Sequence, residues 1–188
     1  MTFVKDLIEK AQHNDLGAFE ELVLIYQDRV YSHCYYLSGN TEDAQDLAQD
    51  VFVQAFKSIR SFRNEADFGT WLHRIAVNLW INLCRRNQKV VTLSIDEPVA
   101  TREGEINREL ASSGESPLEK VERIEFQAMV GSALNQLLPE YKTALVLREI
   151  EGYNYDEIAS LLGCSLGTVK SRINRGRKAL KQALEKQL

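Results

Sequence analysis

The sequence predicts an all-α protein made of two helical domains joined by a flexible acidic linker. Through the first ninety residues apolar side chains recur at spacings of three and four, and no proline interrupts them, because prolines occur only at 98, 117 and 139. Between Lys89 and Glu115 the periodicity is lost, and six acids outnumber three basic residues. Helical periodicity returns after Pro117. We therefore expect domains over residues 1–87 and 116–188, with a linker over 88–115.

The first domain is expected to contain four helices. The first covers about residues 3–12, and the second begins at a cap on Asp15 and runs to about residue 37. Thr41 is expected to cap a third helix that ends near residue 59, where Glu42 and Asp43 suit the positively polarised first turn. The fourth covers about residues 68–86, and residues 90–95 are compatible with a brief extended segment.

The third helix is predicted to carry an acidic face opposite its apolar stripe. The face consists of Asp43, Asp46, Gln49 and Asp50. It is either a solvated surface, which composition alone favours, or a site for a second partner. The whole chain has a net charge of −4, which is unusual for a simple DNA-binding domain.

The fourth helix mixes aromatic rings with cations and amides. Its residues of these kinds are Trp71, His73, Arg74, Asn78, Trp80 and Asn82. Such a surface suits unstacked nucleic-acid bases, because rings offer stacking planes and amides read base edges. The alternative is that the tryptophans belong to the core. For Trp80, in phase with Ala76 and Leu83, the core is favoured, and for Trp71 the surface.

The second domain is expected to end in a helix-turn-helix. Ser116 and Pro117 start one helix, Pro139 opens the next, and Gly152 ends it. A short helix then follows a cap on Asn154, with Glu157 in position to complete a capping box. Gly163 suits the positive φ that ends this helix, and Ser165 can cap the last one.

The last predicted helix is strongly basic. From Cys164 to Leu188 there are seven Lys or Arg residues and one acid, Glu185, a balance of about +6. Leu166, Val169 and Ile173 lie on its apolar face. Such a helix can enter a major groove, neutralise phosphates and show polar side chains to base edges. An ordinary amphipathic helix with a solvated basic face is the alternative.

Other classes of protein are disfavoured. No apolar run approaches 18 residues, and the N-terminus lacks a signal-peptide pattern, so a cytoplasmic protein without direct membrane insertion is expected. Cys34, Cys84 and Cys164 are far apart and are expected to be free thiols. The three histidines look isolated in the sequence. We therefore expect no metal site, no cofactor and no catalytic constellation, and hence no enzyme.

Two long sequence blocks resemble the sigma-70 family of bacterial RNA polymerase sigma factors, and more narrowly its extracytoplasmic-function (ECF) group. The first runs from DAQDLAQDVFVQAF at Asp43 through SFR at Ser61 to FGTWLHRIAVN at Phe68, and resembles region 2. The second comprises LPEY at Leu138, LREIEGY at Leu147, EIA at Glu157 and GTVKSR at Gly167, and resembles region 4. The blocks occur in the expected order and together are highly specific.

The resemblance implies a role for each face of the first domain. Asp43, Asp46, Gln49 and Asp50 would bind the RNA polymerase core through its β and β′ subunits, chiefly at a coiled coil of β′. The loop of residues 60–67 and the fourth helix would capture a flipped base of the −10 promoter element. The implied residues are Phe62, Arg63, Asn64, Trp71, Arg74, Asn78 and Asn82.

The resemblance likewise assigns the second domain to the −35 element. Lys170, Ser171, Asn174 and Arg175 match the contacting positions, and lysine can reach guanine without the fixed fork of arginine. The flanking residues are Thr168 and, toward the phosphates, Arg172, Arg177 and Lys178. The linker would thread the polymerase near the RNA exit path or act only as a solubilising tether. An anti-sigma factor is a further partner that the family implies.

Two other functions remain open from the sequence. A free-standing helix-turn-helix regulator would use the first domain to sense a ligand or another protein. A polymerase-binding protein without promoter-melting activity would share the acidic face. Core-polymerase binding separates the first alternative from a sigma factor, and transcription from duplex or pre-melted promoters separates the second.

Overall fold

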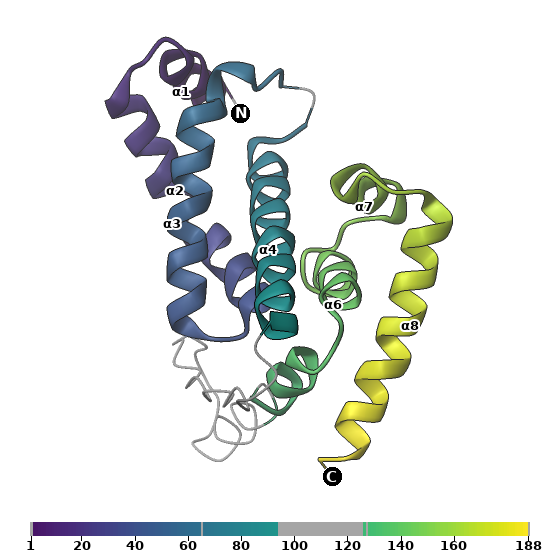
Figure 1. Cartoon of the computed structure of the whole chain (residues 1–188). Helices are drawn as coiled ribbons and strands as arrows, with labels where there is room; N and C mark the ends of the chain where they lie inside the picture. The colour runs from purple at the N-terminus through teal and green to yellow at the C-terminus, as the bar shows by residue number, and fades with distance from the viewer. Residues whose placement is uncertain (1, 65, 94–125, 127, 188) are drawn as a thin grey trace, which may run out of the picture.

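The computed structural model describes residues 2–64, 66–93, 126 and 128–187, and these ranges contain helices and no strand (Figure 1). The predicted all-α fold class is confirmed. Helix α1 (Thr2–Gln12), α2 (Leu16–Ser38), α3 (Thr41–Ser58), a short 3₁₀ turn η1 (Ile59–Ser61) and α4 (Phe68–Leu93) form the N-terminal domain. A helical stretch over 128–135, α6 (Pro139–Leu145), η2 (Val146–Ile150), α7 (Tyr155–Leu162) and α8 (Leu166–Glu185) form the C-terminal domain.

The start of α3 differs by one residue from the prediction. Asn40, not Thr41, is the cap: it has extended backbone angles, and its Oδ1 accepts a hydrogen bond from the Asp43 N–H at 2.8 Å. The prediction for α2 is confirmed, since the Asp15 carboxylate accepts from the Ala18 N–H. Gly39 has a φ of +86° and separates the two helices. Asn40 is the cap because its amide oxygen reaches the N–H of the third residue of the helix.

Helix α4 is longer than the sequence suggested. It continues to Leu93, so the extended segment predicted from Val90 is wrong over residues 90–93, and residues 94 and 95 lie outside the described ranges. The β-branched run at 90–92 favoured a strand, but strand propensity is weak without a neighbouring strand. No glycine or proline lies between residues 70 and 97, so nothing in the sequence stops the helix.

The core of the N-terminal domain lies between α2, α3 and α4. Leu22, Leu37, Leu47 and Leu72 are fully or almost fully buried there. Close-packed aliphatic side chains of this kind are the main source of stability in a small helical domain. The positions match the predicted three-and-four spacing, although Phe56 at 40% exposure and Leu83 at 39% are more open than a core position.

The helix predicted between Pro139 and Gly152 is present, with an irregular end. Residues 146–150 are π-helical, and the Glu151 N–H donates to the Val146 carbonyl at 3.1 Å. Gly152 ends the element with a φ of +75°, as predicted. The wider turn brings Glu151 and Tyr153 toward the N-terminal domain. The start signal predicted at Ser116 lies outside the described residues.

The helix-turn-helix predicted to begin at Asn154 is confirmed at its caps and its turn. The Asn154 side chain and Glu157 form a complete capping box, and Gly163 has a φ of +59°. The Ser165 hydroxyl accepts from the Thr168 N–H at 3.1 Å and caps α8. Leu166 departs from the prediction, since it is exposed although it was assigned to the apolar face. It lies in the first turn of α8, beyond the reach of the underlying helices.

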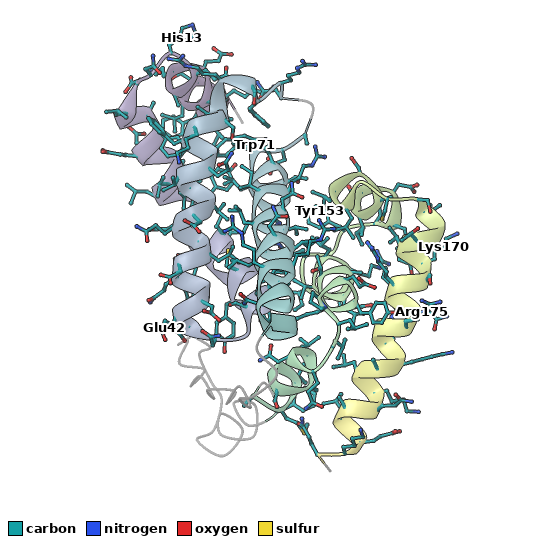
Figure 2. All side chains as sticks on the ribbon, viewed as in Figure 1. His13, Glu42, Trp71, Tyr153, Lys170 and Arg175 are labelled. Carbon is teal, nitrogen blue, oxygen red and sulfur yellow. The ribbon has the colours of Figure 1, made fainter. Side chains whose placement is uncertain are left out.

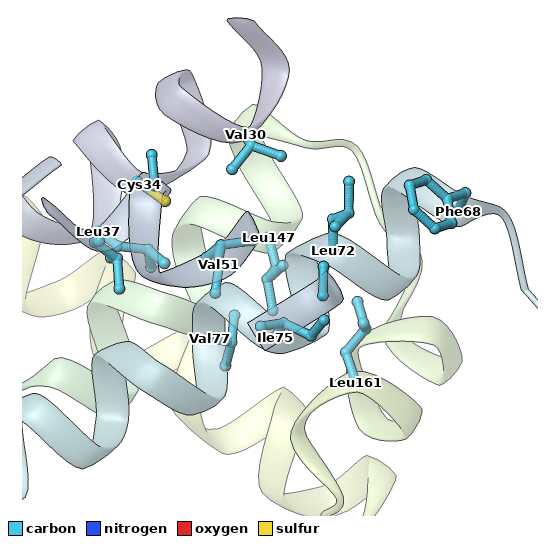
Figure 3. Close-up of a cluster of buried hydrophobic side chains, with 14 of the residues drawn as sticks. Val30, Cys34, Leu37, Val51, Phe68, Leu72, Ile75, Val77, Leu147 and Leu161 are labelled. Atoms are coloured by element: carbon cyan, nitrogen blue, oxygen red, sulfur yellow. The ribbon is translucent and has the colours of Figure 1, made fainter. Parts of the chain in front are cut away.

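The two domains pack against each other around one hydrophobic cluster (Figure 3). Leu147 and Leu161 of the C-terminal domain belong to the same buried cluster as Leu72 and Ile75 of α4. Helix α4 of the N-terminal domain also contacts both α6 and α7 of the C-terminal domain. The sequence predicts each apolar stripe but not which stripes share a core.

Candidate nucleic-acid interface

The acidic face of α3 is exposed in the folded protein. The side chains of Asp43, Asp46, Gln49 and Asp50 are all open to solvent. Asp43 is held locally, since its Oδ2 accepts a hydrogen bond from the Asn40 amide at 2.6 Å. Within the described ranges Asp46 and Asp50 have no ion-pair partner, so their charges face outward. This surface can attract a cationic partner.

Three aromatic rings meet at the start of α4. The Phe62 ring lies 5.4 Å from Phe68 and 5.0 Å from Trp71, measured between centroids. The Gln12 amide donates to the carbonyls of Ile59 and Phe62, which ties the loop to α1. Phe62 is buried, while Trp71 is half-buried and keeps part of its ring at the surface. Figure 2 shows Trp71 near the upper end of α4.

The polar residues predicted to face the −10 element are mostly accessible. Arg63, Asn64, Asn78 and Asn82 are exposed. Arg74 differs: it is half-buried, and its Nη2 donates to the Ser160 hydroxyl of α7 at 3.3 Å. The C-terminal domain therefore covers part of this surface.

The residues predicted to read the −35 element follow one side of α8. Lys170, Asn174, Arg175 and Lys178 are exposed, and Lys170 and Arg175 are visible on α8 in Figure 2. Ser171 is half-buried beside them. The buried side of the helix consists of Val169, Ile173, Gly176 and Ala183. A Cβ at Gly176 would lie 3.0 Å from Leu145 Cγ, so glycine permits the close approach of α8 to α6.

Several cations of α8 already have protein partners. Arg177 Nη2 and Nε both donate to Glu149 Oε1, at 2.6 and 3.1 Å. Arg175 Nη1 reaches the Tyr141 hydroxyl at 3.5 Å, and the half-buried Arg172 lies 3.9 Å from Cys164 Sγ. Thr168 exchanges a hydrogen bond with Ser165. The freest cations on this face are therefore Lys170 and Lys178.

The structure brings together a polar group that the sequence did not reveal. His33 and His73 were treated as isolated, yet their rings stack with centroids 4.2 Å apart beside Glu151 and Tyr153. Lys142 is a second unexpected feature: it is buried, bonds to the Asn135 amide oxygen at 2.7 Å and lies over the Trp80 ring. No local pattern signals that His33 meets Glu151, 118 positions away, or that Lys142 lies over Trp80, 62 positions away.

Burial controls the proton affinity of Lys142. Loss of hydration lowers the pKa of its ammonium to about 8, while the nearby Cys84 opposes that shift. Cys84 responds in the opposite direction, because burial raises the pKa of its thiol to about 11. Trp80 is half-buried and packs against the core, in accord with the interpretation that the sequence favours.

A helical domain with an exposed acidic face, joined in one chain to a basic helix-turn-helix domain, defines a DNA-binding transcription factor of the sigma-70 type. The family model described as Sigma-70 region 2 matches residues 22–90, and the model described as Sigma-70, region 4 matches residues 127–180. The ECF RNA polymerase sigma factor SigW of Bacillus subtilis is 36% identical over 182 residues, which cover 96% of each chain. The RNA polymerase sigma-H factor of Pseudomonas aeruginosa is 36% identical over 184 residues, covering 96% of this chain and 93% of that one.

The chain belongs to the ECF group of RNA polymerase sigma factors. It is thus a transcription initiation factor and not an enzyme. Among solved structures, the sigma factor RpoE of Bartonella quintana, in complex with the anti-sigma factor NepR, aligns with a TM-score of 0.67 and 25% identity. The alignment covers 89% of this chain and 96% of that one. No helix in the described ranges combines the length and apolar character that a membrane span requires.

Proposed function

We propose that this sigma factor divides its work between its domains, with polymerase recruitment and −10 opening in residues 1–87 and −35 recognition in residues 116–188. The observation that carries the proposal is the separation of charge. Exposed carboxylates lie along α3, while α8 bears six Lys or Arg residues and Lys186 follows at its C-terminal cap. A basic helix suits DNA, and an acidic one repels it, so α3 needs a cationic protein partner.

The core polymerase is that partner. Asp46, Gln49 and Asp50 dock on a coiled coil of the β′ subunit, and Asp43 supports the same contact from the first turn of α3. Charge complementarity of this kind guides the encounter and fixes its register.

The −10 element is captured at the exposed end of α4. Trp71 offers a stacking plane, and Asn78 and Asn82 offer hydrogen-bonding edges to a flipped base. The burial of Phe62 supports a role behind Trp71, where its ring holds the tryptophan in place. Arg63, Asn64 and Arg74 complete the surface as donors to phosphates or bases.

The −35 element is read by α8 in the major groove. Lys170, Ser171, Asn174 and Arg175 face the bases. Lys178 and Arg172 contact phosphates, and Thr168 supports the cap at the start of the helix. Because Arg177 is paired with Glu149, it contributes less to phosphate binding than its position in the sequence suggests.

The cellular location and the regulation of the protein follow from these proposed partners. The proposed partners, polymerase and promoter DNA, support a location in the bacterial cytoplasm. The similarity to a sigma factor solved with an anti-sigma factor supports regulation by such a partner. A pull-down from non-inducing cells that recovers only polymerase subunits would argue against an anti-sigma factor.

The proposal is tested by reversing the charge of the acidic face. Asp46→Arg with Asp50→Arg is expected to reduce core-polymerase binding at least a hundredfold, while binding to a −35 duplex stays unchanged. Glu9→Arg, on the exposed side of α1, is the matched control and leaves both unchanged. Unchanged core binding in the double variant would favour a free-standing regulator instead.

Promoter opening needs a separate assay. Run-off transcription with purified core polymerase is expected from a duplex promoter and from the same promoter melted in advance. Trp71→Ala is expected to lower the duplex signal far more than the pre-melted one. If the unaltered protein worked only on the pre-melted template, it would be a polymerase-binding protein without melting activity.

A further inference from the structure

The interface between the two domains contains a buried polar cluster. His33 of α2 and His73 of α4 are both fully buried, and their rings are parallel within 10°. Glu151 Oε1 lies 3.0 Å from His33 Nδ1, and Glu151 Oε2 lies 3.7 Å from His73 Nδ1. The Tyr153 hydroxyl lies 3.0 Å from His73 Nδ1 and 3.3 Å from the hydroxyl of Thr70. Three residues of the N-terminal domain and two of the C-terminal domain therefore meet in one polar group.

This cluster has the residue types of a metal site but not the geometry. Potential donor atoms of His33, His73 and Glu151 lie within 4.8 Å of one another. The lone pair of an imidazole nitrogen lies in the plane of its ring, and zinc binds along that direction. Because the two planes are nearly parallel and the rings are stacked, their lone pairs do not converge on one ion. Hydrogen bonds hold the cluster in this arrangement.

The cluster can balance one protonated imidazole but not two. Glu151 is the only carboxylate that touches the rings within the described ranges. Burial, followed by the charges of His33 and Arg29, lowers the pKa of His73 to about 2. Arg29 approaches from α2, and Asp67 lies near Tyr153 at the start of α4. In the closed protein His73 is therefore neutral, while a solvated histidine takes up a proton near pH 6.5.

The closed arrangement is incompatible with reading both promoter elements. The −10 and −35 elements are about 25 base pairs apart, or roughly 85 Å along B-form DNA. Here Tyr153 of the C-terminal domain touches His73 of the N-terminal domain, and Ser160 holds Arg74 on the −10 surface. The domains must separate before both surfaces can engage DNA, a consequence that rests on the proposed function.

We propose that His33, His73 and Glu151 form a proton-sensitive latch that holds the two domains together near neutral pH and releases them on acidification. Separation exposes His73 to water and lets it take up a proton, so the open form binds one more proton than the closed form. Lowering the pH through 6.5 therefore favours opening. Between pH 7.5 and 5.5 this one proton raises the opening constant about tenfold.

The latch is tested by the distance between the domains in the free protein. Fluorophores at the exposed positions Glu20 and Lys181, attached through bio-orthogonal amino acids, report opening by energy transfer. The unaltered protein and the His13→Gln control, at an exposed histidine, are expected to show the tenfold change. His73→Gln is expected to stay closed and to respond less than twofold.

Other outcomes would overturn the proposal. A full pH response in folded His73→Gln, judged by circular dichroism, would exclude His73 as the sensor. Should that variant fail to fold, Glu151→Gln decides: the proposal expects opening at pH 7.5, and a closed protein contradicts it. Opening by a chelator at pH 7.5, reversed by zinc, would identify a metal site instead. Because the assay contains neither polymerase nor DNA, the latch can fail while the charge-reversal test still supports the proposed function.

Discussion

The two proposed DNA-reading surfaces of this sigma factor differ in how freely they are presented. The basic side of α8 faces solvent, and among the described residues its cations contact only their own domain, as in the pair of Arg177 with Glu149. The −10 surface on α4 is partly engaged across the domain interface, where Arg74 bonds to Ser160. In the closed protein the proposed −35 surface is exposed, whereas the proposed −10 surface is partly covered at Arg74.

The difference also shows how polar groups are used. On α8 the cations are solvated, so each ion pair that they form adds little to the stability of the fold. Such a cation can leave its carboxylate partner for a DNA phosphate. At the domain interface the polar groups are buried, so each must be satisfied or costs free energy. The stability of an interface with buried polar contacts depends on the protonation state of those groups and on each hydrogen-bond partner. The stability of an apolar interface does not.

The largest effect should come from the core that the two domains share. Leu72→Ala, at a fully buried position of α4, is expected to lower the free energy of unfolding by about 2–5 kcal/mol through lost burial and a cavity. Denaturant titration measures this loss. The control Leu24→Ala, at an exposed position, should change the free energy of unfolding by no more than about 0.5 kcal/mol.

Tryptophan fluorescence reports the surroundings of α4, because Trp71 and Trp80 both lie there. If its transition precedes that of the circular dichroism signal, the domains unfold independently.

A smaller effect is expected from removing one free cation of α8. Lys170→Ala should weaken binding to a −35 duplex by about 1–3 kcal/mol and relax its sequence preference, because a base contact is lost. Lys181→Ala removes another exposed charge of α8, one whose ammonium lies near the Glu185 carboxylate. It should weaken binding to the duplex much less than Lys170→Ala does. Titration at two salt concentrations distinguishes base readout from phosphate attraction. Equal losses for the two variants would mean that α8 binds DNA only through its net charge.

The buried cation at the interface predicts a pH dependence. The pKa of Lys142 is lowered to about 8, so between pH 8 and 10.5 the folded protein binds fewer protons there than the unfolded chain. This residue therefore adds stability as the pH rises, by up to about 1.4 kcal/mol per pH unit. Lys142→Met removes this contribution, and the difference between the two stability–pH curves isolates it from other groups. Parallel curves from pH 8 to 10 would contradict the burial of a charged Lys142.

The smallest effect is expected at the exposed ion pair of the C-terminal domain. Arg177→Ala should change the free energy of unfolding by less than about 1 kcal/mol, because solvent screens the pair with Glu149. Binding to the −35 duplex should also fall less than in Lys178→Ala, whose ammonium is free. Thermal melts and duplex titrations of the two variants provide the comparison. A larger loss of affinity for Arg177→Ala would mean that the arginine leaves Glu149 for a phosphate.

Much of the fold could be predicted because helices are local structures. Asn154, Glu157, Gly163 and Ser165 mark the ends of the helix-turn-helix by capping rules that involve only near neighbours. The same rules placed the cap of α3 one residue late, and a β-branched run hid the true length of α4. Such errors arise where adjacent residues could serve equally well or where propensities are weak.

The proposed site was predicted unevenly for a related reason. The exposed charges on α3 and α8 follow from helical periodicity, which separates polar from apolar faces. The burial of Phe62, the contact of Arg74 with Ser160 and the cluster around His73 do not. These three features depend on how the loops and the second domain are placed, and helical periodicity carries no information about that placement.

By itself, the sequence determined the helices, their caps, the two charged faces and the family resemblance, because each is encoded by residues within a few positions of one another. Only the tertiary structure decided that the domains share a core and that His33 meets Glu151, which lies 118 residues away. Contacts at such separation arise from the packing of whole apolar surfaces and the closure of the intervening chain. The proposed latch consists of such long-range contacts and therefore depends on the tertiary structure.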